Sequence, residues 1–210
     1  RMLRVGVPSA GETLIIRFSM IFLNVLLAGL GTNVVAANQI AFNILGLSWL
    51  PSIAFATAAG TLVGQSLGAK NPDLAERFGW TTNNYAMLLS GVVGLGFIFF
   101  AEWVVLLYTS DPDVIRLSSV ALQVIGFTQV FQSAQYVLSG ALRGAGDTKF
   151  NMQVALWGVI IFRIIVTGIF IFVFHWGLFG AWLALALDQI FRSSLFAFRF
   201  RQGRWKSIRV

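Results

Sequence analysis

The chain has 210 residues, of which 57% are hydrophobic and only 11% are charged, with a formal net charge of +7. So few charges cannot cover the surface of a water-soluble domain of this length, but they suffice if most of the surface faces lipid. The sequence has no Cys and one His, His175, which excludes disulfides, thiolate metal sites and a histidine metal cluster.

Apolar stretches long enough to cross a bilayer, about 20 residues each, recur six times along the chain. They lie at 8–30, 33–67, 74–108, 112–142, 150–174 and 178–200. The connections are short and rich in turn formers, and the apolar runs are continuous rather than alternating. The sequence therefore predicts an all-α, polytopic membrane protein, a single six-transmembrane-helix bundle over 1–210.

Basic residues gather on one side of this predicted topology. The side that carries both chain ends holds Arg1, Arg4, Lys70, Arg77, Arg143, Lys149, Arg199, Arg201, Arg204, Lys206 and Arg209. The opposite side holds Arg116 with Glu102, Asp111 and Asp113. Because Lys and Arg favour cytoplasmic loops, we expect a cell-membrane protein with both termini in the cytoplasm. The lipid bilayer, rather than nucleic acid, then accounts for the basic charge.

The amino terminus begins with Arg1 rather than Met, and no cleavable signal precedes the first span. The short basic opening resembles a linker that enters a helix at Pro8. We therefore expect a larger segment to precede it.

The first span contains two ionisable residues, Glu12 and Arg17. They are five residues apart, so on a helix they point in different directions and need separate partners. A buried carboxylate that changes protonation is the minimum apparatus for proton coupling, whereas a carboxylate held by an Arg is structural. Both interpretations of Glu12 stay open.

The second span combines a proline with small residues at four-residue intervals. Ala56, Gly60, Gly64 and Gly68 form a ridge suited to close helix packing, with a flexible gate as the alternative. Pro51 removes a backbone hydrogen bond and predicts a kink, which is either a simple bend or a hinge.

Polar amides cluster on two spans. Gln39 and Asn43 are one turn apart in the second span, and Gln129, Gln132 and Gln135 follow at intervals of three in the fourth. Such groups are costly against lipid, so they should face the bundle interior or a watery cavity. Hydrogen bonding between helices and lining of a solute pathway are both compatible with this pattern.

The last two spans contain three more charged residues. Arg163 lies near the middle of the fifth span, and Asp188 and Arg192 lie four apart on one face of the sixth, where they can pair. For Asp188, a structural ion pair and a role in coupling or pathway electrostatics both stay open.

Enzyme chemistry has little support. The segment GALRGAGDTK contains glycines but follows a membrane span and lacks the Gly-Lys-Ser/Thr ending of a phosphate-binding loop. The sequence offers no nucleophile–base constellation and no metal-ligand spacing, so we expect neither catalysis nor a cofactor.

Several segments in order along the chain resemble the multidrug and toxic compound extrusion (MATE) family. They are GVPSAGETLIIR, VVAANQIAFNI, TLVGQSLGAKNPDLAERFGW, SGALRGAGDT and GLFGAWLALALDQIFRSSLFAFRFRQGRWK. The resemblance implies a transporter of twelve helices in two six-helix lobes around a central cavity, exporting amphiphilic, often cationic compounds against a proton or sodium gradient. By this likeness the chain is the carboxyl-terminal lobe, and its partner is an amino-terminal lobe or a second copy.

Two positions depart from the family pattern. Many members carry a Glu eight residues after the proline of the first helix of this lobe, where this chain has Ile16. Sodium-type members carry an Asp eleven residues before the Arg of GALRG, where this chain has Gln132. The resemblance therefore favours protons over sodium as the coupling ion, acting through the other lobe.

Three hypotheses follow. The first is efflux by rocking of this lobe against a partner, with Gln39, Asn43, Gln132 and Gln135 along one cavity wall. The second is a flippase for lipid-linked sugars of related architecture, which would favour a cationic cavity with Arg17 and Arg163. The third is a non-transporting assembly subunit, in which the polar residues are packed and no water-filled cavity exists.

Overall fold

The computed structural model describes residues 2–29 and 31–207, with side chains over 10–29 and 31–206. Its helices are α1 (Met2–Ala28), α2 (Thr32–Gly68), α3 (Pro72–Leu106), α4 (Pro112–Gly144), α5 (Thr148–Gly158) and α6 (Gly177–Arg201). The π-helical segments η1 (Val159–Val166) and η2 (Ile169–Val173) continue α5, and a short 3₁₀ helix, η3 (Arg204–Ser207), follows α6. The predicted all-α class with six helices is confirmed. Arg1, Arg209 and the end of the first predicted span at residue 30 lie outside the described residues, as does the side chain of Arg4.

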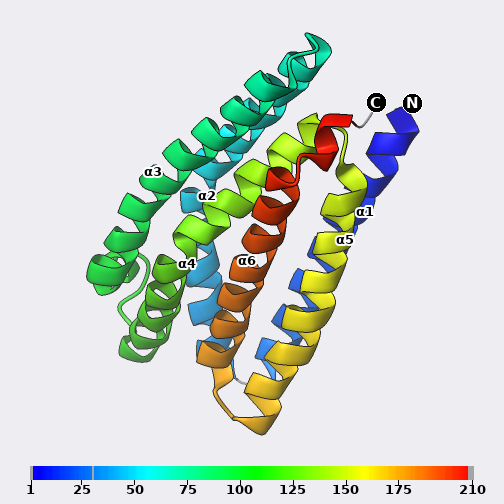
Figure 1. The fold of residues 1–210 in the computed structure, drawn as a ribbon. Helices are drawn as coiled ribbons and strands as arrows, with labels where there is room; N and C mark the ends of the chain where they lie inside the picture. Colours follow the sequence, from blue (N-terminus) through cyan, green and yellow to red (C-terminus); the bar gives the residue numbers. More distant parts are fainter. Residues whose placement is uncertain (1, 30, 208–210) are drawn as a thin grey trace.

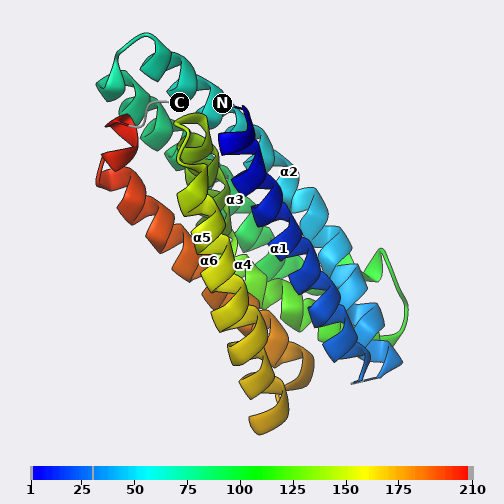
Figure 2. The ribbon, with the colours of Figure 1, turned by 90° about the vertical axis from the view of Figure 1, so that its right-hand side faces the viewer.

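The helices form one elongated bundle (Figure 1). Helix α4 packs against α2, α3 and α6, while α1 packs mainly against α5. Figure 2 shows α1 and α5 running side by side along the face that is turned away from α3. The start of α1, the α2–α3 turn, the α4–α5 turn and η3 all lie at one end of the bundle. This end carries the predicted basic side.

Five helical stretches in the described part of the chain are long and apolar enough to cross a membrane. They are Ala10–Ala28, Thr32–Gly68, Pro72–Leu106, Pro112–Gly144 and Thr148–Val173. Helix α6 is not among them, because Asp188, Gln189 and Arg192 in its middle make it less apolar. Its crossing, and with it the sixth span, stays a prediction.

Helices α2 and α4 meet through glycine. A Cβ added at Gly64 would lie 3.2 Å from the carbonyl oxygen of Gly144, and one added at Gly144 would run into the backbone of Gly60. The packing interpretation of the small-residue ridge therefore describes Gly60 and Gly64 correctly. It is wrong for Gly68, where an added Cβ would meet nothing within 4 Å. The reason is that α4 ends at Gly144, opposite Gly64, so the last turn of α2 extends beyond it.

The helices depart from regular geometry at positions that the sequence does not single out. Helix α2 continues through Pro51 to Gly68, and both a kink at Pro51 and its role as a hinge stay predictions. Helix α3 departs from helical geometry at Phe100, with φ −119° and ψ 19°. The fifth helix is largely π-helical, and there Thr167 Oγ1 donates to the carbonyl of Phe162 at 2.9 Å. Phe100 has no Pro or Gly next to it, whereas the two π-helical segments begin directly after Gly158 and Gly168.

Candidate functional site

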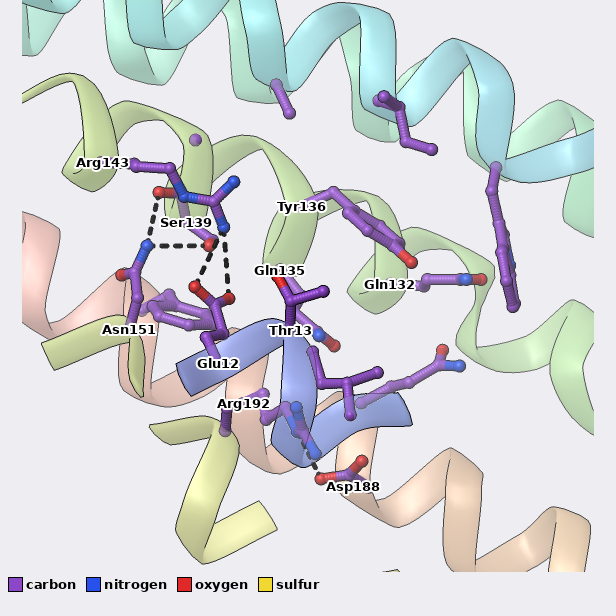
Figure 3. Close-up of a pocket in the computed structure, with 18 of the residues that line it drawn as sticks. Glu12, Thr13, Gln132, Gln135, Tyr136, Ser139, Arg143, Asn151, Asp188 and Arg192 are labelled. Atoms are coloured by element: carbon purple, nitrogen blue, oxygen red, sulfur yellow. Dashed lines mark hydrogen bonds and ion pairs between the residues drawn. The ribbon is translucent and has the colours of Figure 1, made fainter. Parts of the chain in front are cut away.

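The helices line an open cavity of about 850 Å³, which we call the bundle cavity. It is bordered by α1, α2, α4, α6 and the helix that comprises α5 and η1. Helix α1 contributes a stripe of successive turns, namely Glu12, Thr13, Ile16, Arg17 and Met20. Figure 3 shows polar side chains of α4 projecting toward those of α1 and α6 around this space.

A buried ion cluster forms one part of the cavity wall. Arg192 Nε donates to Asp188 Oδ1 at 2.6 Å, which confirms the ion pair expected from their spacing. Arg163 Nε lies 3.6 Å from Asp188 Oδ2, close enough for an ion pair but too far for a hydrogen bond. Arg163 also donates from Nη1 to Ser19 Oγ at 2.9 Å, which connects the fifth helix to α1. One carboxylate thus serves two guanidinium groups.

Gly158 makes room for this cluster. A Cβ added there would run into the Asp188 carboxylate and the Arg192 guanidinium, so the backbone of α5 lies directly against the ion pair. The sequence gives no signal for this position, because its contact partners lie on α6, some thirty residues further along the chain.

A second ion pair lies nearer the end of the cavity that faces the α4–α5 turn. Both carboxylate oxygens of Glu12 accept from Arg143 Nη2, at 3.1 and 3.2 Å. The Glu12 side chain is 11% exposed and that of Arg143 is 49% exposed. Close by, Asn151 Nδ2 donates to the carbonyl and the hydroxyl of Ser139 (Figure 3). The pair connects α1 to the last turn of α4.

Arg17 lacks such a partner. It borders the cavity and is exposed to it, and no carboxylate in the described part of the chain pairs with it. Of the separate partners expected for Glu12 and Arg17, the described structure shows one, Arg143 for Glu12. Both nevertheless border one cavity, because the space is wide enough to cover the angle of about 140° between positions five apart on a helix.

The clustered Gln and Asn side chains have different roles: one forms a hydrogen bond between helices, and others border the cavity. Gln129 is buried and donates to Ser48 Oγ at 3.0 Å, which is a hydrogen bond between α4 and α2. Gln132 and Gln135 border the bundle cavity. Gln39 and Asn43 are exposed on the outer surface of α2 and do not border this cavity. A place for these two along a solute pathway between lobes stays a prediction.

An aromatic wall completes the cavity. Phe42 and Trp49 of α2, Tyr136 of α4 and Trp182 of α6 all border it. The rings of Phe42 and Trp182 lie 4.9 Å apart between centroids, and those of Trp49 and Tyr136 lie 6.5 Å apart. Sequence reasoning missed these residues, because the only signal was the general abundance of aromatic residues.

Comparison with known proteins identifies the family of this fold. The family model MatE matches residues 8–169. The chain belongs to the MatE family. It is therefore a multi-pass membrane protein of a transporter family, not an enzyme family.

Individual relatives agree with this assignment. A probable multidrug resistance protein NorM of Thermotoga maritima is 32% identical over 209 residues, which are 98% of this chain and 44% of that protein. A probable NorM protein of Xanthomonas axonopodis is 32% identical over 207 residues, or 96% of this chain and 44% of that protein. The chain thus spans less than half the length of these curated relatives.

Solved structures show the same fold. A crystal structure of MATE in the bent conformation superposes with a TM-score of 0.89 at 22% identity, covering 96% of this chain and 44% of the other. The MATE transporter VcmN of Vibrio cholerae in the bent form gives a TM-score of 0.88 at 15% identity, covering 96% of this chain and 46% of the other. At these identities the likeness concerns the fold alone.

Proposed function

We propose that this chain is one lobe of a secondary transporter that exports amphiphilic organic compounds, including cationic drugs, driven by an ion gradient. The observation that carries the proposal is the bundle cavity, with about 850 Å³ of space, charged and amide groups on one wall and aromatic rings on another. Small-molecule sites usually have volumes of about 300–1,000 Å³ and combine an apolar lining with few polar groups.

The lobe is the carboxyl-terminal one in this proposal. The support is the resemblance of GVPSAGETLIIR to the first helix of the second half of MATE transporters. The chain's coverage of under half of its relatives supports a single lobe. Both termini lie on the cytoplasmic side, because the basic residues gather at the end of the bundle that holds the α2–α3 and α4–α5 turns.

Export then proceeds by rocking of this lobe against a partner lobe or a second copy, with α2, α3 and α4 moving as one body. The close backbone contacts of Gly60 with Gly144, between α2 and α4, and of Gly94 with Gly126, between α3 and α4, support rigid motion of these helices. The exposed amides Gln39 and Asn43 supply polar groups on a surface of α2 that is free to face the partner.

Protons rather than sodium drive this exchange, through a carboxylate of the other lobe. The support is that Ile16 and Gln132, where family members carry carboxylates, both border the cavity, while its two carboxylates, Glu12 and Asp188, are already held by arginines. In the described part of the chain, no three His, Cys, Asp or Glu side chains come together as a metal site.

Transfer of lipid-linked sugars across the membrane is the second candidate. Its support is the cationic lining to which Arg17 and Arg163 contribute, as that hypothesis requires. The assembly-subunit hypothesis requires packed polar residues and no cavity, and the bundle cavity counts against it.

Reconstituted vesicles separate the two transport candidates. We expect ethidium efflux from proteoliposomes under an imposed proton gradient when this chain and its partner lobe are present together, and loss of that efflux on adding an uncoupler. Transfer of a fluorescent pyrophosphate-linked lipid between leaflets, without gradient-driven efflux, would instead support the flippase hypothesis. Neither activity from folded protein would contradict the proposed function.

A further inference from the structure

We infer that the bundle cavity binds the acid group of an amphiphilic organic anion or zwitterion, between Arg17 and the cluster of Arg163, Asp188 and Arg192. The inference adds acidic and zwitterionic compounds to the substrates of the proposed transporter, beside cations such as ethidium, and rests on that function for its physiological role. Binding itself requires no transport, so it is tested separately.

The charge of the cavity lining is the first observation. Four guanidinium groups border the cavity, those of Arg17, Arg143, Arg163 and Arg192, against the carboxylates of Glu12 and Asp188. The lining therefore carries a formal excess of two positive charges. An excess of one sign of charge in a cleft with low-dielectric walls attracts ions of the opposite sign into it.

The ion pairs among the cavity residues show where the excess positive charge lies. Glu12 is occupied by Arg143, with both oxygens engaged by one guanidinium nitrogen. Asp188 is shared between Arg192 and Arg163, so one positive charge of that cluster is uncompensated. Arg17 adds the second, since none of the described carboxylates pairs with it and it lies inside the candidate span Ala10–Ala28. An anion is therefore attracted to the space between Arg17 and the cluster.

Unused hydrogen-bond donors are the second, independent observation. Arg192 Nη2, Arg163 Nε, Trp49 Nε1 and Trp182 Nε1 are buried and donate to no acceptor in the described structure. Arg192 is 3% exposed and Trp182 is 1% exposed, and all four residues border the cavity. A buried donor without an acceptor is destabilising, so a ligand that supplies an acceptor is favoured. A carboxylate, sulfonate or phosphate supplies acceptors only, which is what these donors lack.

The other residues that line the cavity indicate what the rest of the ligand is like. Phe42, Trp49 and Trp182 offer aromatic surface for an apolar body. The amide oxygens of Gln132 and Gln189 are buried acceptors without a donor, which suits a hydroxyl of the ligand or a water molecule beside it. The ligand is therefore an amphiphile with an acid group and an aromatic or aliphatic body.

A pair of dyes with one skeleton and opposite charge tests this inference. Fluorescein is an anion at mildly alkaline pH, and the methyl ester of unsubstituted rhodamine is a cation on the same ring system. Their fluorescence anisotropy is measured with the purified chain in nanodiscs of phosphatidylcholine. We expect fluorescein to bind at least about tenfold more tightly than the rhodamine ester. Equal affinity, or tighter binding of the cation, would overturn the inference.

Variants of Arg17 test whether fluorescein binds in the bundle cavity. Since Arg17 is exposed and unpaired, its replacement leaves the folded bundle intact. We expect Arg17→Gln to weaken fluorescein binding about tenfold, as for loss of one charge-assisted hydrogen bond, and Arg17→Lys to retain most of it. Arg77→Gln, on the exposed start of α3 away from the cavity, is the matched control and should leave affinity unchanged. An effect of Arg77→Gln equal to that of Arg17→Gln would show mere surface attraction.

The lipid composition of the nanodiscs distinguishes two sources of the anion. If phosphatidylglycerol displaces fluorescein, the acid group belongs to a lipid head group; if it does not, the ligand is a soluble compound. Both outcomes retain the anion site. Anion-selective binding together with failed efflux would count against transport but not against the site, whereas efflux without anion selectivity would count against the site alone.

Discussion

Helices α2, α3 and α4 approach one another through their backbones, whereas α1 and the fifth helix enclose the cavity through side chains. A Cβ added at Gly60 would lie 2.9 Å from the carbonyl oxygen of Gly140, and one added at Gly126 would lie 2.8 Å from that of Gly94. Backbone contacts cannot rearrange without moving whole helices, but ion pairs such as that of Glu12 can change partners. The comparison indicates that α2, α3 and α4 form a rigid side of the bundle. Helix α1 and the fifth helix form an adaptable side, whose ion pairs can rearrange.

The largest effect is expected on the rigid side. Gly60→Leu would force α2 and α4 apart, since its side chain would meet a carbonyl group that cannot move alone. We expect the free energy of unfolding to fall by at least about 3 kcal/mol. Size-exclusion chromatography should then show little folded protein after extraction from membranes. Gly46→Leu, on the same helix but with nothing within 4 Å of the added Cβ, should express normally. Similar yields from the two variants would contradict the close crossing.

The next effect concerns the ion cluster of the adaptable side. Asp188→Asn leaves two buried guanidinium groups without a counter-charge, and we expect a loss of about 3–5 kcal/mol of stability. Glu12→Gln breaks a pair whose Arg143 is 49% exposed, so its cost should be about 1 kcal/mol or less. Thermal unfolding followed by tryptophan fluorescence compares them. Equal melting temperatures would show that the depth of the pair does not matter.

A smaller loss of stability is expected at Gly158, where the backbone of α5 lies against the ion cluster. Gly158→Ala places a methyl group against Asp188 and Arg192 and should cost about 1–3 kcal/mol. Gly168→Ala lies on the same fifth helix, and its added Cβ has no neighbour within 4 Å, so it should be neutral or slightly stabilising. A stable Gly158→Ala variant would mean that α5 does not press on the pair.

The smallest effect belongs to the surface. Lys206 donates to Glu76 at 2.6 Å and more weakly to Asp73, and the hydrogen bond to Glu76 raises the pKa of its ammonium group. Because the folded pKa is the higher one, this contribution is complete below the ordinary lysine pKa and is lost as pH rises through the folded value. Lys206→Gln should cost less than about 1 kcal/mol at neutral pH in the same unfolding assay. A larger loss would show that η3 holds α3 and α6 together.

Sequence spacing predicted those contacts whose partners share one helix or one face. The pairing of Asp188 with Arg192 and the ridge at Gly60 and Gly64 follow from a four-residue repeat. It could not predict that Arg163 joins Asp188 or that Arg143 holds Glu12, because those partners meet only when separate helices pack.

The amides show the same limit. Gln129 and Gln132 are three residues apart and chemically identical, yet one bonds to Ser48 and the other borders the cavity. Which side of α4 meets α2 decides this, and a periodic pattern does not carry that information. The π-helical segments begin directly after Gly158 and Gly168, but a glycine within a helix does not by itself predict a π-helix.

The absence of Cys from the chain allows the central claim, a water-accessible cavity inside the bundle, to be tested with single introduced cysteines. Gln135→Cys borders the cavity, and Gln129→Cys lies buried on the same helix as its matched control. The measurement is the rate of labelling by a charged, membrane-impermeant methanethiosulfonate reagent in inverted membrane vesicles. We predict fast labelling at position 135 and protection at position 129. Equal protection of both positions would contradict the cavity and, with it, the proposed path for the substrate.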